Sequence, residues 1–553
     1  MSNWYSTLNP DAVKQQTGEA AWIVNEDQLK SNLIRLAQFT GSTERIFYPV
    51  KANPAIPVLQ FLAANGAGAD CANLAEVQQA LFCGFPINRI AYNSPVQEMK
   101  VIDFILSAGG IVVLDDPQVM RTLKLNWREE FSSGSIWARV NPLTTVDYSV
   151  KDSLQELMAH GSESSKFGIP EEELQSLLLE LRLPVNGLHL HVGTQMDNLS
   201  SFASAMQSLH RMAQQIKSVG IEIQHLDIGG GLGIPFGKGQ VFPSIEEWAA
   251  ELNNLKKDYN YYAEPGHALV GDAVVLLITI QSIKHSRGKR WAVCNVGTDQ
   301  LAKITLLKWE HEIYCGDGVY MSHEGSDALA GPLCFAGDVL LHHTDVSNLK
   351  AGQSLFITKA GAYLYALSNT FNGRSALPWY GMNSNGDLIL SMQKEDLHGR
   401  IFLQHPDWSK KEYAISNTLE LEHIHQLQSD YISRTIQDDT YEFLEVKRMG
   451  EKRYRFATRV SSPVGFISMP LATRIFADAC IVAVLDDAGS AKKDHSVWGQ
   501  KITLDYFGNI SSEASFDFFV TLSHNYTHNE ARKLVVSFET VERGIQGMVL
   551  VNH

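Results

Sequence analysis

The stretch Arg45–Lys51, with the sequence RIFYPVK, is the first of eight short runs that decide the fold. Each run is rich in apolar residues and bounded by turn residues, which is typical of a short buried strand. The other seven runs are Ala67–Cys71, Arg89–Ser94, Gly110–Asp115, Ser135–Asn141, Gly187–Gly193, Gln224–Gly229 and Asn260–Gly266. Segments with helical spacing, such as FASAMQSLHRMAQQIKSVG at 202–220, lie between them. The pattern predicts an α/β fold built on a closed parallel (β/α)8 TIM-like barrel.

Chemically special residues fall at the carboxyl ends of these runs. The set comprises Lys51, Asp70, Arg139, His191, the glycines from Gly229, and Glu264. In a barrel those strand ends converge on one face, where active sites are built. The sequence therefore predicts a single site at that face.

Composition narrows the class of protein and its partners. The 553 residues exceed one ordinary domain, with 44% apolar and 19% charged residues and a net charge of −15. No apolar run is long enough to span a bilayer, and no long basic run favours nucleic acid or an anionic membrane. The six cysteines lack CxxC spacing, and the first residues do not form a secretory signal. We expect a cytoplasmic protein without a nucleic-acid or membrane partner.

The character of the sequence changes after the barrel. Residues 26–269 are predicted to form the barrel, while 1–25 and 270–405 form a β-rich domain. The run Ala20–Asn25 is a candidate to pair with the barrel. Residues 415–553 suggest a hairpin, one long buried helix and four more strands, an α+β pattern that resembles the hot-dog fold of thioesterases and dehydratases. Asp478 on that helix is a conceivable catalytic carboxylate, although a capping or solvated acid is the stronger interpretation.

Two motifs point to chemistry at the barrel mouth. Lys51 ends an apolar strand and precedes Asn53-Pro54, so its amine should enter the mouth. Partial desolvation there predicts a lowered pKa, which suits Schiff-base formation. Asp227-Ile-Gly-Gly-Gly-Leu-Gly233 follows another strand, and its bare glycines either make a tight turn or let amide groups cradle a phosphate.

His189 and His191 lie two apart on one predicted strand and face the same way. A metal site is the weaker interpretation, because no carboxylate or cysteine with ligand spacing accompanies the pair. We expect no metal, and a stacking or core role for His191.

Residues 20–400 resemble the fold-type III decarboxylases that use pyridoxal 5′-phosphate (PLP), namely the diaminopimelate, ornithine and arginine decarboxylases with an alanine-racemase-like barrel. The matching motifs occur in the family's order across the barrel and the β domain. They are Tyr48-Pro-Val-Lys51-Ala-Asn53, Asp70-Cys-Ala, Arg139-Val-Asn-Pro, Ser165-Lys-Phe-Gly168, His191-Val-Gly-Thr194, Asp227-Ile-Gly-Gly-Gly231, Glu264-Pro-Gly266, Gly331-Pro-Leu-Cys334, Gly337-Asp338, and Ala360-Gly-Ala-Tyr363 followed by Phe371-Asn-Gly.

The resemblance implies a role for each matching residue. Lys51 holds PLP as a Schiff base, Asp70 lies beside that lysine, and Arg139 lies near the ring. The remaining cofactor contacts are His191 stacked on the ring, Thr194, Gly229, Gly230, Gly231, Gly266, His267 and Tyr363 at the phosphate, and Glu264 at the pyridine nitrogen. The predicted cofactor is therefore PLP.

Glu264 also favours one reaction. A carboxylate keeps the pyridine nitrogen protonated, so the ring can accept the electrons released when CO₂ leaves. Related racemases place an arginine there instead. In the family, Cys334 belongs to the partner subunit and is associated with protonating the product, which implies a homodimer with shared active sites.

Three positions depart from the family. His267 stands where the family has an arginine after Glu-Pro-Gly, and Phe335 stands where diaminopimelate decarboxylases have a glutamate. Lys303 stands where an arginine contacts the distal carboxylate of the substrate, and a lysine lacks the bidentate fork. Asp338 is left available for a substrate ammonium. We therefore predict a specialised, conjugated or carrier-tethered amino-acid substrate in a biosynthetic pathway.

Three other functions stay open at this point. The first is an amino-acid racemase or epimerase on the same barrel, and the second is an inactive decarboxylase-like regulator. The third makes the C-terminal domain the main enzyme, acting as a thioesterase or dehydratase.

Overall fold

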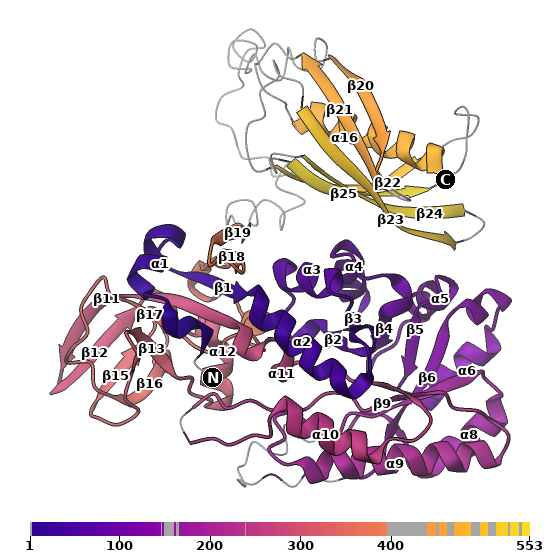
Figure 1. The fold of residues 1–553 in the computed structure, drawn as a ribbon, viewed down its shortest axis with the longest axis horizontal. Coiled ribbons are helices and arrows are strands. Elements are labelled where there is room, and N and C mark those ends of the chain that lie inside the picture. Colours follow the sequence, from indigo (N-terminus) through magenta and orange to yellow (C-terminus); the bar gives the residue numbers. More distant parts are fainter. Residues whose placement is uncertain are drawn as a thin grey trace, which may run out of the picture. The chain divides into compact units, whose positions relative to one another are not determined.

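The chain forms two compact units, Met1–Gln404 and His405–His553, each described here by itself (Figure 1). The computed structural model describes residues 3–394, except 145, 147, 149–159, 162–164 and 238, together with the helix and strands between 440 and 552. Among the described residues, no helix has both the length and the apolar character that crossing a membrane requires.

The first unit contains the predicted parallel barrel. Its strands are β2 (Phe47–Pro49), β3 (Gly68–Cys71), β4 (Ile90–Asn93), β5 (Ile111–Leu114), β6 (Ser135–Asn141), β8 (Val185–His189), β9 (His225–Asp227) and β10 (Asn260–Tyr262), with the short β7 (Ile169–Pro170) beside β6. A parallel bridge between Ile46 and Ala263 joins the two ends of the sheet. The (β/α)8 prediction is confirmed. Most strands end earlier than predicted, so Lys51 and His191 lie in the turns that follow their strands.

Helices cover the outside of the barrel (Figure 1). They are α2 (Glu26–Thr40), α3 (Ile56–Ala64), α4 (Leu74–Phe82), α5 (Met99–Ser107), α6 (Pro117–Leu125), α8 (Glu171–Leu181), α9 (Leu199–Ser218) and α10 (Ile245–Leu255). In α2, Leu29, Leu33 and Leu36 follow helical spacing and are fully buried. Asn25 caps the helix by accepting a hydrogen bond from the Gln28 amide.

The β-rich domain is built around an N-terminal strand. That strand, β1 (Ala21–Asn25), pairs antiparallel with β11 (Val274–Ser286) and parallel with β18 (Trp379–Met382). The expectation that it pairs with the barrel is wrong, because its two edges are both taken by strands of the β domain. The other strands are β12 (Lys289–Cys294), β13 (Ile313–Gly316), β14 (Val319–Tyr320), β15 (Asp327–Ala330), β16 (Val339–Thr344), β17 (Ser354–Ile357) and β19 (Leu388–Met392).

Three helices accompany these strands. They are α1 (Pro10–Thr17), the short α11 (His267–Val270) and α12 (Thr298–Leu307). The sequence analysis did not predict α12, whose backbone kinks at Leu301 and which carries Lys303.

Among its described residues, the second unit is an antiparallel sheet packed on one helix, as predicted. Its strands lie in the order β20 (Thr440–Arg448), β21 (Arg453–Ser461), β23 (Phe516–His528), β24 (Ala531–Thr540), β25 (Ile545–Asn552) and β22 (Trp498–Tyr506), with α16 (Met469–Asp487) between β21 and β22 in the chain. Phe476 of α16 packs edge-on against Phe518 with ring centroids 4.8 Å apart. The name hot-dog stays a prediction, and the side chain of Asp478 lies outside the described residues.

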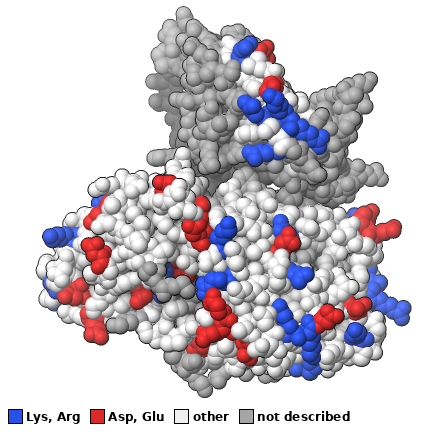
Figure 2. Space-filling model, viewed as in Figure 1, with Lys and Arg blue, Asp and Glu red and all other residues white. Residues whose placement is uncertain are grey.

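Charges of both signs are interspersed on the face of the first unit drawn in Figure 2. In the second unit, blue side chains gather over the described residues, where β20 and β21 carry several lysines and arginines (Lys447, Arg448, Arg453, Arg455 and Arg459). Glutamates neutralise two of them, because Arg459 pairs with Glu442 and Lys447 pairs with Glu445.

Candidate active site

A cavity of about 440 Å³ opens at the carboxyl ends of the barrel strands. It brings together most of the residues singled out from the sequence. Its wall includes Lys51, Arg139, His191, Thr194, Gly231, Glu264, Gly266, His267, Lys303 and Tyr363. The predicted convergence of strand ends on one site thus holds for residues that span more than 300 positions of the chain.

Lys51 reaches the cavity from a single 3-10 turn, Val50–Ala52, directly after β2. Its side chain keeps 46% of its exposed area, and its ammonium forms an ion pair with the buried Asp70 at the end of β3. Burial lowers the pKa of Lys51, but the charges of Asp70 and Glu264 outweigh it, so the net pKa lies above the ordinary lysine value. The predicted lowering of this pKa is therefore wrong, since the sequence did not reveal how near the two carboxylates lie.

The glycine run 229–231 leaves no room for side chains. A Cβ on Gly229, Gly230 or Gly231 would lie 2.5, 2.2 or 2.4 Å from a backbone oxygen of a neighbouring segment. Two of the three amides are already used, because Gly229 N–H donates to Asp227 Oδ1 at 2.8 Å and Gly230 N–H donates to His191 Nδ1 at 3.0 Å. Gly231 lines the cavity. The run is a close-packed cradle, but in this structure it does not present all three amides to a ligand.

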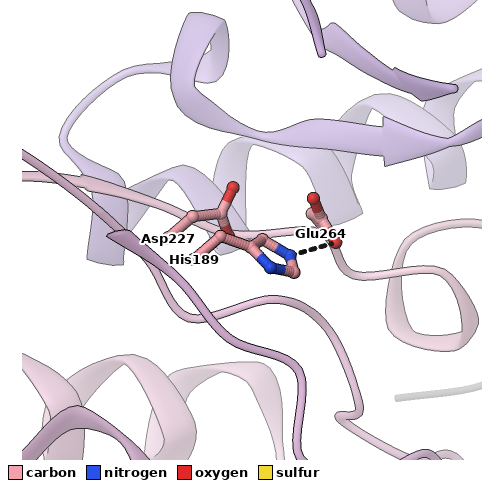
Figure 3. A group of neighbouring side chains, drawn as sticks. All are labelled: His189, Asp227 and Glu264. Carbon is pink, nitrogen blue, oxygen red and sulfur yellow. Dashed lines mark hydrogen bonds and ion pairs between the residues drawn. The ribbon is translucent and has the colours of Figure 1, made fainter. Parts of the chain in front are cut away.

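Three buried side chains, His189, Asp227 and Glu264, lie close together, and Glu264 lines the cavity (Figure 3). His189 Nε2 lies 3.2 Å from Glu264 Oε2, while Glu264 Oε1 and Asp227 Oδ2 are buried with no hydrogen-bond partner. Burial raises the pKa of Glu264, but His189 and Lys51 outweigh it, and the net pKa lies below the ordinary value. An ionised carboxylate with an unused oxygen in a cavity wall is suited to accept a hydrogen bond from a protonated ring nitrogen.

His189, Asp227 and Glu264 are also residues of the types that bind metal ions, which concerns the prediction that there is no metal site. Their ligand atoms lie within 4.8 Å of one another, the one such group of metal-binding type among the described residues. The sequence pattern paired His189 with His191, whereas the structure groups His189 with Asp227 at the end of β9 and with Glu264, which follows β10. The spacing of histidines along one strand could not reveal partners on neighbouring strands.

Aromatic rings line one side of the cavity. The His191 ring lies 4.8 Å from that of His160, and burial lowers the pKa of His191 well below its ordinary range. Burial likewise lowers the pKa of His160 to about 4. Arg139 lies 4.5 Å from the ring centre of Phe167 and donates to Asn93 Oδ1 at 3.3 Å. Neutral His191 suits stacking on a flat ring. Sequence analysis missed His160, Phe167 and Asn93 as parts of the site.

The opposite side is formed by α12 and the turn after β17. Lys303 Nζ lies 3.4 Å from His267 Nε2 and donates to the Ala362 carbonyl at 3.1 Å. The His267 ring packs against that of Tyr363 with centroids 4.7 Å apart. Tyr363 itself has a positive φ of 58°, and its amide donates to the Ala52 carbonyl at 2.7 Å. This wall therefore connects directly to the turn that carries Lys51.

Three predicted residues lie away from this cavity. Cys334 is exposed and Phe335 keeps 48% of its exposed area. Asp338 is buried, and its carboxylate accepts hydrogen bonds from Thr298 N–H, Thr298 Oγ1–H and Leu333 N–H. Asp338 thus holds the start of α12 against the loop that carries Cys334, and its role toward a substrate ammonium stays a prediction.

The comparisons with known proteins agree with this geometry. A family model described as pyridoxal-dependent decarboxylase, pyridoxal binding domain, matches residues 26–271. Residues 26–271 are therefore a pyridoxal-binding domain of the PLP-dependent decarboxylase type. The diaminopimelate decarboxylase of Archaeoglobus fulgidus is 28% identical over 374 residues, covering 66% of this chain and 87% of the relative. That of Campylobacter jejuni is 25% identical over 405 residues, covering 71% and 97%.

A solved structure shares the fold of the first unit. The Helicobacter pylori diaminopimelate decarboxylase complexed with L-lysine superposes with a TM-score of 0.65 at 22% identity, covering 72% of this chain and 99% of that one. This likeness shows the fold of the barrel and β domain, while the family model and the relatives confirm the predicted cofactor and the PLP-dependent carboxy-lyase class. PLP supplies an electron sink for the pair released with CO₂.

The cavity fits that cofactor. The unused Glu264 oxygen matches a ring nitrogen, the glycine cradle matches a phosphate, and the Lys51 amine matches the aldehyde. These three features come from different strands of the barrel.

Proposed function

We propose that this amino-acid decarboxylase acts on a modified amino acid, conjugated or carrier-tethered, rather than on free meso-diaminopimelate. The observation that supports it is the wall at α12, where Lys303 is fully buried behind His267. An arginine fork that could grip a distal carboxylate is missing at this position. Leu307, Trp309 and Leu367 line the cavity on that side and favour an apolar or extended substituent.

The chain's own residues have distinct tasks in this proposal. Lys51 holds the cofactor covalently, and Asp70 accepts its hydrogen bond and keeps the amine in place before the cofactor binds. Glu264 stays ionised and holds a proton on the ring nitrogen. His189 supports Glu264 from below, through the 3.2 Å contact. His191, Arg139, Thr194, Gly231 and Gly266 all line the cavity; the first two would hold the ring of the cofactor, and the other three would hold its phosphate.

We further propose that the active unit is a homodimer in which Cys334 serves the partner's cavity. The residue is exposed, and its amide donates to Asn372 Oδ1 at 2.8 Å, in a turn where Asn372 has a positive φ of 56°. This hydrogen bond fixes the loop that presents the thiol. Phe335 stands next to it and would enter the same neighbouring site, where a bulky ring in place of a carboxylate disfavours a substrate with a free distal ammonium.

The substrate experiment is a screen of diamino acids and of their acylated, peptidyl or thioester-linked derivatives. Loss of CO₂ from each compound is followed by mass spectrometry, with Lys51→Ala as the inactive control. A conjugated compound turned over faster than meso-diaminopimelate supports the proposal. Faster turnover of free meso-diaminopimelate contradicts it, and loss of chirality at Cα without CO₂ would indicate racemisation instead.

The shared site is tested by mixing two variants. Lys51→Ala and Cys334→Ala are purified separately, then unfolded and refolded together so that subunits exchange. Because one of the two sites in a mixed dimer carries both intact residues, activity should rise above that of either variant alone. Mixing Lys51→Ala with Lys51→Ala that carries a different tag is the matched control. Recovery no greater than in that control would place Cys334 outside the neighbouring site.

A further inference from the structure

Lys303 is a buried cation without an anionic partner. Its side chain is fully buried on α12, and no carboxylate of the described residues lies within ion-pair distance of its ammonium. Burial alone lowers the pKa of Lys303 well below the ordinary lysine value. An unpaired buried charge is costly, and the cost falls when an anion binds beside it. Since Lys303 lines the cavity, a bound ligand can supply that anion.

The neighbours of Lys303 show which end of the ligand it faces. Its Nζ contacts His267 Nε2 at 3.4 Å and the Ala362 carbonyl at 3.1 Å, and lies 3.9 Å from the ring centre of Phe236. Phe236 follows the glycine cradle, His267 follows Gly266, and Ala362 precedes Tyr363. All three contacts thus come from segments that form the phosphate end of the cavity.

The contact with His267 also fixes where that imidazole carries its proton. When Lys303 carries its proton, as it would beside a bound anion, its ammonium can only donate, so His267 Nε2 accepts and the ring proton lies on Nδ1. Within the described part of the chain, Nδ1 has no hydrogen-bond partner, and His267 lines the cavity. The ring itself is held by Tyr363 at 4.7 Å and Phe236 at 5.7 Å between centroids. His267 is therefore a fixed N–H donor backed by a cation.

We propose that Lys303 and His267 act as a pair that completes the phosphate site of the cofactor. His267 Nδ1–H donates to a phosphate oxygen, and Lys303 is a positioning residue that supplies positive charge and orients the imidazole. The pair takes the place of the arginine that related decarboxylases carry after Glu-Pro-Gly. Lys303 is then committed to the cofactor and is not a ligand of the substrate.

The test compares two cofactor forms on the full-length apoenzyme. PLP and pyridoxal, which lacks the phosphate, are titrated by absorbance, and the ratio of their dissociation constants reports on phosphate recognition alone. Lys303→Met should weaken PLP at least about tenfold and leave pyridoxal unchanged, because it removes one charge-assisted contact. His267→Phe should have a similar effect, and the double variant should add little to either one.

Two further variants serve as controls. Lys303→Arg keeps the charge and should retain most of the preference for PLP. Lys359→Met removes a nearby lysine that pairs with Glu312 at 3.3 Å outside the cavity, and should leave the ratio unchanged. If Lys303→Met does not fold, the ratio of the PLP and pyridoxal dissociation constants, measured on His267→Phe and Lys303→Arg, still tests the proposal.

Two results would overturn the pairing. Parallel weakening of PLP and pyridoxal in Lys303→Met would show that the lysine only supports the fold. An unchanged ratio with a raised KM for the amino-acid substrate would assign Lys303 to the substrate. A wild-type protein that binds neither compound would instead refute the cofactor site itself, so the two failures can be told apart.

Discussion

The floor and the α12 wall of the same cavity differ in how closely they follow the decarboxylase pattern. The floor, made of Lys51, Asp70, Glu264 and His191, keeps the residues that the family uses for the cofactor. The wall carries His267 and Lys303 where the family has two arginines, and outside the cavity Phe335 stands where diaminopimelate decarboxylases have a glutamate. The difference agrees with our proposal that the chemistry is retained while substrate recognition has changed, because substitutions at the electron sink are less well tolerated than substitutions that affect substrate binding.

The largest expected effect concerns the floor. Lys51→Ala should reduce decarboxylation at least about a thousandfold, since the covalent attachment of the cofactor is lost. An absorbance band near roughly 420 nm, which borohydride abolishes in the wild type, should also be missing. Lys166→Ala is a suitable control, because Lys166 lies over the Phe167 ring at 5.2 Å and has no such role. Retained activity in Lys51→Ala would refute the proposed attachment.

The next largest effect concerns the charge of Glu264 in the cavity floor. Glu264→Gln keeps the size of the side chain but removes the charge that holds a proton on the ring nitrogen. We expect kcat to fall on the order of a hundredfold, in the range seen when one preorganised electrostatic contact is removed, with little change in KM. If Glu264→Gln changes mainly KM, Glu264 contributes to substrate binding rather than to the electron sink.

A smaller effect follows from pH. Burial raises the pKa of Asp70 to about 6, with Glu264 adding to the rise and Lys51 opposing it. Asp70 is therefore ionised above about pH 6 and becomes protonated below it, when its ion pair with Lys51 is lost. Cofactor loading should fall as pH drops through 6, and the acid limb should flatten in Asp70→Asn. An unshifted acid limb in that variant would assign the titration to another group.

The smallest expected effect concerns metal. Dialysis against EDTA should leave decarboxylation of the PLP-loaded enzyme unchanged, because one Glu264 oxygen contacts His189 and the other would be taken by the ring nitrogen of the cofactor. Added zinc should compete with PLP, since it would occupy the same carboxylate. Activity that EDTA removes and a divalent cation restores would instead make the buried trio a metal site.

Local sequence patterns predicted the residues of the cavity floor, but they did not predict how the residues of the α12 wall contact one another. Lys51 and the glycine run carry strong sequence marks, since each ends a buried strand and is bounded by turn residues. The pKa of Lys51 was predicted in the wrong direction because Asp70 and Glu264 come from other strands. The hydrogen bonds of Asp338 were not predicted for a similar reason, because its partners Thr298 and Leu333 lie five or more residues away. Contacts between residues that are far apart in the sequence leave no local pattern from which they could be predicted.

The placement of β1 has a consequence for how this chain matures on the ribosome. Val24 pairs with Val274, and Trp22 stacks on Trp379 at 5.4 Å between ring centroids. At about 5–20 residues per second, the apolar segment AWIVN emerges well over ten seconds before either neighbouring strand exists. During that interval it is an unpaired hydrophobic edge of the kind that chaperones bind. The barrel can close meanwhile, but the β domain must wait for nearly 380 residues of synthesis before its central strand is enclosed.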